Sequence, residues 1–139
     1  MIEAARDYAG LLAYLERVAP YRFGYRGRET HDCVRFGLGG VLAQGLPRPR
    51  GLPSWSSQRQ AEALLVTRGG LIAAVDSIYT RIPASLAQRG DLVAVEGPDQ
   101  PGLGLVEGER LVFPTRPSGL VRAPLSVAVA AWSVTWPKP

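Results

Sequence analysis

The sequence of 139 residues has one cysteine, Cys33, one histidine, His31, and no asparagine. A single cysteine excludes an internal disulfide and a zinc site built from several thiolates. A single histidine excludes a histidine-rich metal centre, and the acidic residues are too scattered to suggest a carboxylate cluster. The lack of asparagine removes a residue that orients the histidine in some cysteine-based catalytic triads. We therefore expect no bound metal and no cofactor.

Lysine is also nearly absent, because Lys138 is the only lysine among the 16 basic residues; 12 acidic residues leave a formal net charge of +4. This skew is typical of genome base composition, so it weakens any argument from arginine count. The loop over residues 20–32 is rich in arginine, with Tyr21, Phe23 and Tyr25 interleaved, and this combination is found on nucleic-acid surfaces. Since the arginine bias is global, we expect no nucleic-acid partner.

Long apolar runs are missing as well. The longest one, residues 125–132, is interrupted by Ser126, whereas a membrane-spanning helix needs about 20 apolar residues. The first residues carry acidic side chains where a secretory signal peptide has a basic region followed by an apolar core. We expect neither a membrane span nor a signal peptide.

What the sequence does contain is typical of one globular domain. Hydrophobic residues make up 46% and charged residues 20% of the chain, which is well outside the range of disordered proteins. The length suits a single domain over residues 1–139. The 16 glycines and 12 prolines predict many turns and short elements.

The first part of the chain, to about residue 80, has helical patterns. Apolar residues at helical spacing predict a helix over residues 4–18 that ends before Pro20. Capping residues predict helices over 33–44 and 58–68, and a shorter one follows over 71–79. Three glycines in the 33–44 segment disfavour a helix by roughly 1 kcal/mol each. Such glycines make sense where another element packs closely on the helix.

From about residue 90 to 139 the pattern changes to short extended runs separated by turns. The predicted strands cover residues 91–96, 103–107 and 111–113, followed by a short helix near residue 125 and an extended piece over 132–136. Helices come first and strands follow, so the fold class is α+β, with N-terminal helices packed on a small antiparallel sheet.

Cys33 is the candidate site residue. A thiol at the first turn of a helix lies near the positive end of the dipole, which lowers its pKa and favours the nucleophilic thiolate. The alternative is that Cys33 is an ordinary small buried residue. Asp32 is a good N-cap for this helix, but its negative charge opposes thiolate formation. A base is also needed, and His31 is so close in the chain that we expect it to be an exposed loop residue and not a working partner.

Several short motifs occur in an order that resembles a known family. They are Leu12-Ala13-Tyr14-Leu15, Phe23-Gly24, Asp32-Cys33, Gly45-Leu46-Pro47, Ala61-Glu62-Ala63-Leu64, Gly69-Gly70-Leu71, Leu86-Ala87-Gln88-Arg89-Gly90-Asp91-Leu92-Val93, Gly102-Leu103-Gly104-Leu105, Gly119-Leu120-Val121 and Ala131-Trp132. Together they resemble a domain of unknown function found in tail-gene clusters of phages and prophages. That domain is itself similar to NlpC-like cell-wall cysteine peptidases, which have a papain-like fold.

The resemblance implies an NlpC-like fold in which Cys33 opens a helix packed on the sheet and Gly90-Asp91 starts the first strand. In NlpC-like enzymes the catalytic histidine starts the next strand. Here Gly102 occupies that position, and no histidine follows it. An essential group of the triad is therefore absent, and we expect Cys33 to be a vestigial nucleophile in a protein that is not an enzyme.

Two functions follow from the resemblance. The first is a structural or adaptor component of a phage or phage-like tail or tail tip, in the virion, assembled in the bacterial cytoplasm among tail-tip or hub subunits. The second is a peptidoglycan-cleaving cysteine peptidase that uses Cys33 with a non-standard base. We expect three segments to expose interface-type arginine and aromatic side chains to partner subunits: residues 20–32, 46–57 and 132–139.

Overall fold

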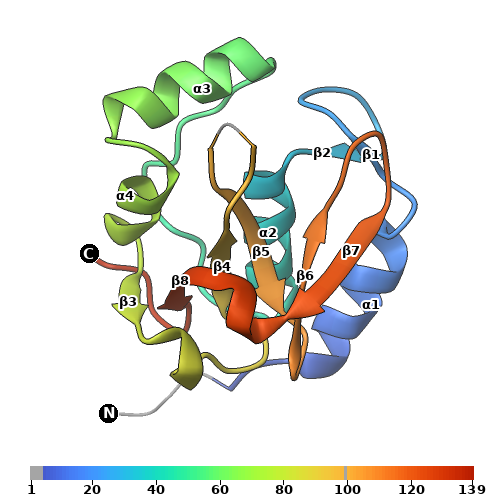
Figure 1. The fold of residues 1–139 in the computed structure, drawn as a ribbon, viewed down its shortest axis with the longest axis vertical. Coiled ribbons are helices and arrows are strands. Elements are labelled where there is room, and N and C mark those ends of the chain that lie inside the picture. The colour runs from blue at the N-terminus through green and yellow to red at the C-terminus, as the bar shows by residue number, and fades with distance from the viewer. Residues whose placement is uncertain (1–4, 99) are drawn as a thin grey trace.

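A computed structural model describes residues 5–98 and 100–139 of the chain (Figure 1). It has four α-helices: α1 (Tyr8–Val18), α2 (Cys33–Ala43), α3 (Gln58–Thr67) and α4 (Leu71–Asp76). The strands are β1 (Arg22–Phe23), β2 (Thr30–His31), β3 (Thr80–Ile82), β4 (Leu92–Val95), β5 (Gly102–Val106), β6 (Arg110–Pro114), β7 (Leu120–Pro124) and β8 (Ala128–Ser133). Two short 3₁₀ helices, η1 (Ala84–Leu86) and η2 (Leu125–Val127), complete the chain.

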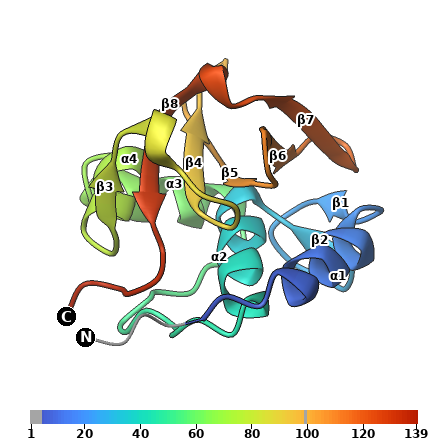
Figure 2. The same ribbon diagram turned by 90° about the horizontal axis from the view of Figure 1, so that it is seen from below.

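The main sheet has six strands in the order β3-β8-β4-β5-β6-β7, and every neighbouring pair is antiparallel. All four residues of β4 are buried because this strand lies inside the sheet. Helices α1 and α2 pack together beneath the sheet in Figure 2, with α2 against β5. The fold is therefore α+β, as the order of the sequence patterns predicts, with helices on a small antiparallel sheet.

The three longer predicted helices are present, with small shifts at their ends. Helix α1 begins at Tyr8 because the Asp7 carboxylate caps it, accepting a hydrogen bond from the Gly10 N–H at 2.8 Å. Ser57 caps α3 in the same way through the Gln60 N–H. The predicted segment 71–79 is helical only over α4. These caps satisfy backbone donors that would otherwise have no partner at a helix start.

The glycines of α2 allow the sheet to approach the helix closely. A Cβ built on Gly37 would lie 2.9 Å from side-chain atoms of both Leu92 and Leu103. A Cβ on Gly40 would overlap the side chain of Leu105. The helix is therefore held by burial against β4 and β5 in spite of its weak propensity, as the three glycines indicate.

The sequence patterns miss four parts of the sheet structure. The extended piece expected over residues 132–136 is instead the inner strand β8, which starts at Ala128 and ends at Ser133. Strand β3 joins the edge of the main sheet before residue 91, and β7 forms the opposite edge. Both were hard to detect because β3 has only three residues and edge strands lack a continuous apolar pattern: only Ile82 of β3 is partly buried. In addition, the predicted loop over 20–32 contains β1 and β2, which pair in parallel as a separate two-stranded sheet.

Candidate functional site

Cys33 is the first residue of α2, and Asp32 is the N-cap. The Asp32 carboxylate accepts a hydrogen bond from the Arg35 backbone N–H at 2.9 Å, so the cap predicted from the sequence is confirmed. Asp32 is itself only 3% exposed. The helix start that carries the thiol is therefore fixed by a buried carboxylate immediately before it.

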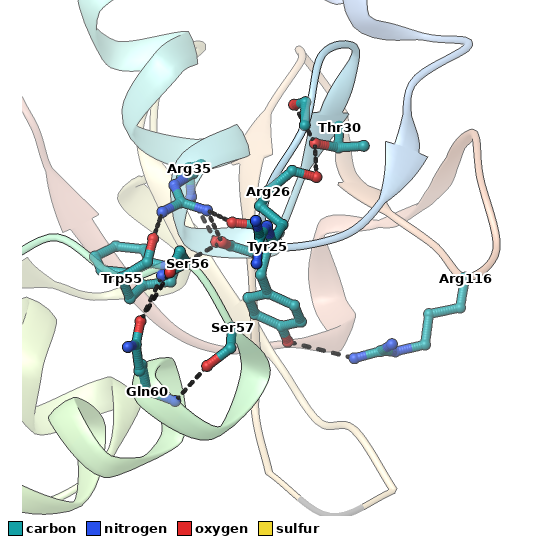
Figure 3. Close-up of polar contacts among 11 residues, drawn as sticks. Tyr25, Arg26, Thr30, Arg35, Trp55, Ser56, Ser57, Gln60 and Arg116 are labelled. Carbon is teal, nitrogen blue, oxygen red and sulfur yellow. Dashed lines mark hydrogen bonds and ion pairs between the residues drawn. The ribbon is translucent and has the colours of Figure 1, made fainter.

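Two long side chains hold this carboxylate in place. The indole Nε1–H of Trp55 donates a hydrogen bond to Asp32 Oδ2 at 2.8 Å, and Arg35 Nη1 lies 3.2 Å from the same oxygen. Arg35 also donates to the carbonyl oxygens of Tyr25 and Trp55, and its guanidinium lies over the Trp55 ring (Figure 3). The cluster of Asp32, Arg35 and Trp55 thus ties the loops before and after α2 to the start of that helix.

Cys33 lines a groove of about 310 Å³. Its lining comes from four parts of the fold, namely the segment around β1, the start of α2, the first turns of α3 and the ends of β4, β5 and β6. The lining includes Gly102, so the structure brings Cys33 and Gly102 to one groove. A Cβ on Gly102 would meet only Val95 Cγ2, at 3.8 Å, which leaves room for a side chain at this position.

One wall of the groove is aromatic and basic. Phe23 and Tyr25 pack edge to face, with ring centroids 6.0 Å apart. The Arg116 guanidinium lies 4.2 Å from the Phe23 ring centroid. It also donates a hydrogen bond of 3.3 Å to the Tyr25 hydroxyl (Figure 3). Phe23 and Tyr25 belong to the aromatic, arginine-rich loop over residues 20–32, whereas Arg116 is 91 residues from Tyr25 along the chain. No local sequence signal points to that contact.

The thiol of Cys33 is a poor acid in this setting. Burial raises its pKa above the ordinary value, and the charge of Asp32 raises it further. The backbone N–H groups of Leu103, Cys33 and Val34 act in the opposite direction, because they stabilise the thiolate. Burial is the largest of these effects, so the neutral thiol predominates near neutral pH, when it is a weak nucleophile.

The prediction that His31 is an exposed loop residue is wrong. The imidazole is 4% exposed and lies between Tyr21 and Phe36, with both ring centroids 5.4 Å away. Neither ring nitrogen has a hydrogen-bond partner among the described residues. Burial lowers the pKa of His31, an effect that Asp32 opposes only in part. His31 therefore packs as an aromatic residue of the core, and it does not line the groove of Cys33.

The Gly90-Asp91 motif forms a turn that joins distant parts of the chain. Gly90 has φ +89°, a conformation that favours glycine. The Asp91 carboxylate accepts hydrogen bonds of 2.8 Å from Arg6 Nη2 and from the Gln88 N–H. Arg6 also donates to the Arg89 carbonyl and the Thr135 hydroxyl. Asp91 thus has a structural role before β4.

The C-terminal segment is less exposed than expected. Trp132 is fully buried and donates a hydrogen bond of 2.8 Å to Asp76, because its strand β8 lies inside the sheet between β3 and β4. Trp136 is 48% exposed. In the loop over 46–57, the Trp55 side chain contacts Asp32 and Arg35 of the same chain. The exposed aromatic surface is therefore smaller than the sequence predicts.

The part of the chain that the structure describes has neither a membrane-spanning helix nor a metal-binding cluster. None of the helices there combines the length and the apolar character that crossing a membrane requires. Within residues 5–98 and 100–139 there is also no group of three or more histidine, cysteine, aspartate or glutamate side chains arranged to hold a metal ion.

Comparison with known proteins gives one finding. No curated protein matches the chain. Residues 5–134 match the family described as a domain of unknown function, DUF6950. Since this match covers nearly the whole sequence, including the groove of Cys33, the chain belongs to the DUF6950 family.

Proposed function

We propose that this protein is a structural or adaptor component of a phage or phage-like tail or tail tip, built on an NlpC-like, papain-like fold that has lost its peptidase activity. The observation that carries the proposal is the composition of the Cys33 groove. Gly102 lies where the resemblance implies a catalytic histidine, and the only histidine of the chain, His31, lies outside the lining.

The chemistry of the groove supports a role without catalysis. A cysteine peptidase needs a base that takes the thiol proton and later protonates the leaving amine. Among the described residues of the lining, the titratable side chains other than Cys33 and Tyr25 are Glu62, Glu96 and Arg116. A carboxylate is a much weaker base than imidazole, and arginine stays protonated. Because burial also raises the pKa of the thiol, the described part of the groove holds the thiol without a group that would activate it.

The same groove is suited to holding a protein segment. Phe23, Tyr25 and Arg116 are residue types that often anchor protein interfaces, and they are held together by mutual contacts. Such a prearranged wall loses little side-chain entropy when a partner binds. The partner would be another tail subunit of the tip or hub, bound in the virion after assembly in the bacterial cytoplasm.

A tail-assembly experiment tests the adaptor role. We expect Cys33→Ala to support tail assembly and infection at the native level, because the thiol does no chemistry. Arg116→Ala removes the guanidinium that joins Phe23 to Tyr25, so we expect incorporation of the protein into tails to fall at least severalfold. Incorporation is measured by quantifying the chain in purified particles. Normal incorporation of Arg116→Ala, or absence of the native chain from particles, would contradict the proposal.

Digestion of purified peptidoglycan tests the loss of activity. We expect the native chain to release no stem peptides. Gly102→His adds the imidazole that NlpC-like enzymes have, at a position where the built Cβ has its nearest neighbour at 3.8 Å. Gly102→Gln is the matched control, because it adds a side chain of similar length without a base. Release by Gly102→His alone, abolished by adding Cys33→Ala, would identify a disarmed peptidase site.

The alternative is a peptidoglycan peptidase with a non-standard base. The backbone N–H groups of Leu103, Cys33 and Val34, which stabilise the thiolate, are the observation that favours it. Release of stem peptides by the native chain, lost in Cys33→Ala, would establish this alternative and refute the adaptor proposal.

A further inference from the structure

His31 is a buried titratable residue that the proposed function does not use. Its side chain is 4% exposed, and both ring nitrogens are shut off from solvent and lack a hydrogen-bond partner among the described residues. The ring packs between Tyr21 and Phe36, whose ring centroids are each 5.4 Å away. A neutral imidazole can occupy such a site, whereas an imidazolium would bury a positive charge without hydrogen bonds to compensate it.

The charged groups around the ring do little to hold a proton there. His31 lies in β2, which packs against β1 and α2. The charged side chain of β1, Arg22, is exposed, that of α2, Arg35, pairs with Asp32, and the Cys33 thiol of α2 is neutral near pH 7. Asp32 is the neighbour whose charge favours a proton on the imidazole, but burial outweighs this attraction and lowers the pKa of His31.

The strand that carries His31 is weakly attached. Strands β1 and β2 pair over two residues each, with Phe23 opposite His31, and they lie outside the six-stranded sheet (Figure 1). The Gly24 N–H donates to the His31 carbonyl and the Arg22 N–H donates to the Glu29 carbonyl, each at 3.1 Å. A two-stranded unit with so few backbone hydrogen bonds opens at low free-energy cost. The packed imidazole therefore contributes directly to keeping this small sheet closed.

The same small sheet supports the aromatic wall of the Cys33 groove. Phe23 of β1 lines the groove, and its ring contacts both Tyr25 and the Arg116 guanidinium. Phe23 is also the residue that lies opposite His31 in the pairing of β1 with β2. Separation of the two strands therefore withdraws backbone support from the central residue of this wall.

We propose that His31 is a pH-sensitive latch: when its ring takes up a proton, the β1–β2 sheet opens and the wall of Phe23, Tyr25 and Arg116 comes apart. The closed form binds this proton less readily than the open form, in which the imidazole is hydrated. Below the ordinary imidazole pKa of about 6.5, the open population therefore rises by up to about tenfold per pH unit, until the pH reaches the lowered pKa of the closed form. A tail subunit bound at the wall is then released in acid, a step that rests on the proposed function.

NMR of the full chain tests the latch, because His31 is the only histidine and its ring signals are identified directly. The rings of His31, Phe23 and Tyr25 are followed as the pH is lowered from about 7.5 to about 5. We expect the imidazole to titrate with a midpoint below about 6.5 and the two wall rings to change at the same midpoint, while the amide signals of β4 keep their folded positions. Hydrogen exchange of the Gly24 N–H, corrected for its intrinsic rate, should accelerate by up to about tenfold per pH unit over this range.

His31→Phe is the matched control, because it keeps a ring between Tyr21 and Phe36 without a titratable group. In this variant the wall signals and the corrected exchange of Gly24 should not respond to pH. Should His31→Phe fail to fold, the titration of the native chain still decides, since its single imidazole reports its own protonation. The proposal is overturned if the imidazole binds its proton while the wall signals stay unchanged, if it titrates only together with unfolding of β4, or if the wall responds equally in His31→Phe.

Purified tail particles separate the latch from the proposed function. When particles are washed at about pH 5, below the ordinary range of imidazole, they should lose the native chain severalfold more than the His31→Phe chain. Equal retention of the two chains would overturn the release step. Absence of both chains from particles at neutral pH would refute the adaptor role, while the NMR titration of the isolated chain would still decide whether the latch exists.

Discussion

His31 and Asp32 are adjacent in the chain and both are buried, yet among the described residues only the Asp32 side chain has hydrogen-bond partners. Asp32 accepts from the Arg35 backbone and from Trp55, whereas the His31 ring has aromatic neighbours alone. A buried carboxylate is tolerated when donors surround it, and a buried imidazole is tolerated when it stays neutral. Because the buried His31 ring is tolerated only when it is neutral, its contribution to stability depends on pH.

Acidification should destabilise the protein through His31. Burial lowers its pKa in the folded state below the usual value near 6.5, so the unfolded chain binds the proton more readily. Stability is complete above about pH 6.5 and falls as the pH decreases toward the folded pKa, with a slope of at most about 1.4 kcal/mol per pH unit for one proton. Urea unfolding at pH values from about 7.5 to about 5 measures this slope.

His31→Phe provides the control for that pH dependence. It keeps an aromatic ring between Tyr21 and Phe36 but removes the titratable group. We expect its stability to be nearly constant over the same pH range, above the range in which carboxylates titrate. If the stability of His31→Phe falls with decreasing pH as steeply as that of the native chain, another group causes the loss of stability.

The reactivity of Cys33 can be predicted from its surroundings. Because burial raises its pKa above the ordinary value, alkylation by iodoacetamide near neutral pH should be much slower than that of an unstructured cysteine peptide. The rate should increase with pH past the ordinary range of about 8.5 to 9. Half-maximal alkylation well below that range would indicate a live nucleophile and would contradict the adaptor proposal.

At the scale of elements, α2 combines a poor helix sequence with a central position. Gly40→Ala should improve helix propensity by about 1 kcal/mol, but the new methyl overlaps Leu105 in β5. The overlap lies in a packed core, so we expect a net loss of about 1 to 3 kcal/mol in the free energy of unfolding. Chemical denaturation of the variant measures this loss.

A second substitution separates steric overlap from other effects. Leu105→Val removes the δ-carbons nearest to the new methyl, so the double variant should be more stable than the sum of the two single changes predicts. Additive losses would mean that Gly40 is needed for a reason other than its approach to β5.

At the scale of the whole molecule, Arg6 connects the two ends of the chain through the Asp91 turn. Its guanidinium binds Asp91, Arg89 and Thr135, and the side chains of Arg6 and Asp91 are 7% and 2% exposed. Removal of one partner of a buried ion pair leaves an uncompensated charge. We therefore expect Arg6→Ala to lower the free energy of unfolding by about 3 to 5 kcal/mol.

A double variant tests this explanation. Arg6→Met with Asp91→Asn removes both charges and leaves an oxygen that accepts from the Gln88 N–H. Its stability should exceed that of Arg6→Met alone. If Asp91→Asn instead adds a further loss, the carboxylate is stabilised without Arg6. Thermal or urea unfolding, followed by fluorescence and by circular dichroism with coincident transitions, gives the free energies of unfolding of the double variant and of Arg6→Met.

Local patterns in the sequence determined the α+β class, the positions of α1, α2 and α3, and the cap before Cys33, because apolar periodicity and capping act within a few residues. The strands that begin and end the sheet were missed, since β3 is short and β7 lies at an edge where alternation is weak. The glycines of α2 predicted a close contact between this helix and another element, but the sequence did not show that Leu105 makes the contact.

Only the tertiary structure decided where the site residues lie. It brought Gly102 and Arg116 to the groove of Cys33, and it buried His31 between aromatic rings that come from different parts of the chain. It also buried the Tyr79 hydroxyl, which has no hydrogen-bond partner among the described residues. These outcomes depend on contacts between residues far apart in sequence, whose free energies are set by packing and burial and leave no periodic pattern in the sequence.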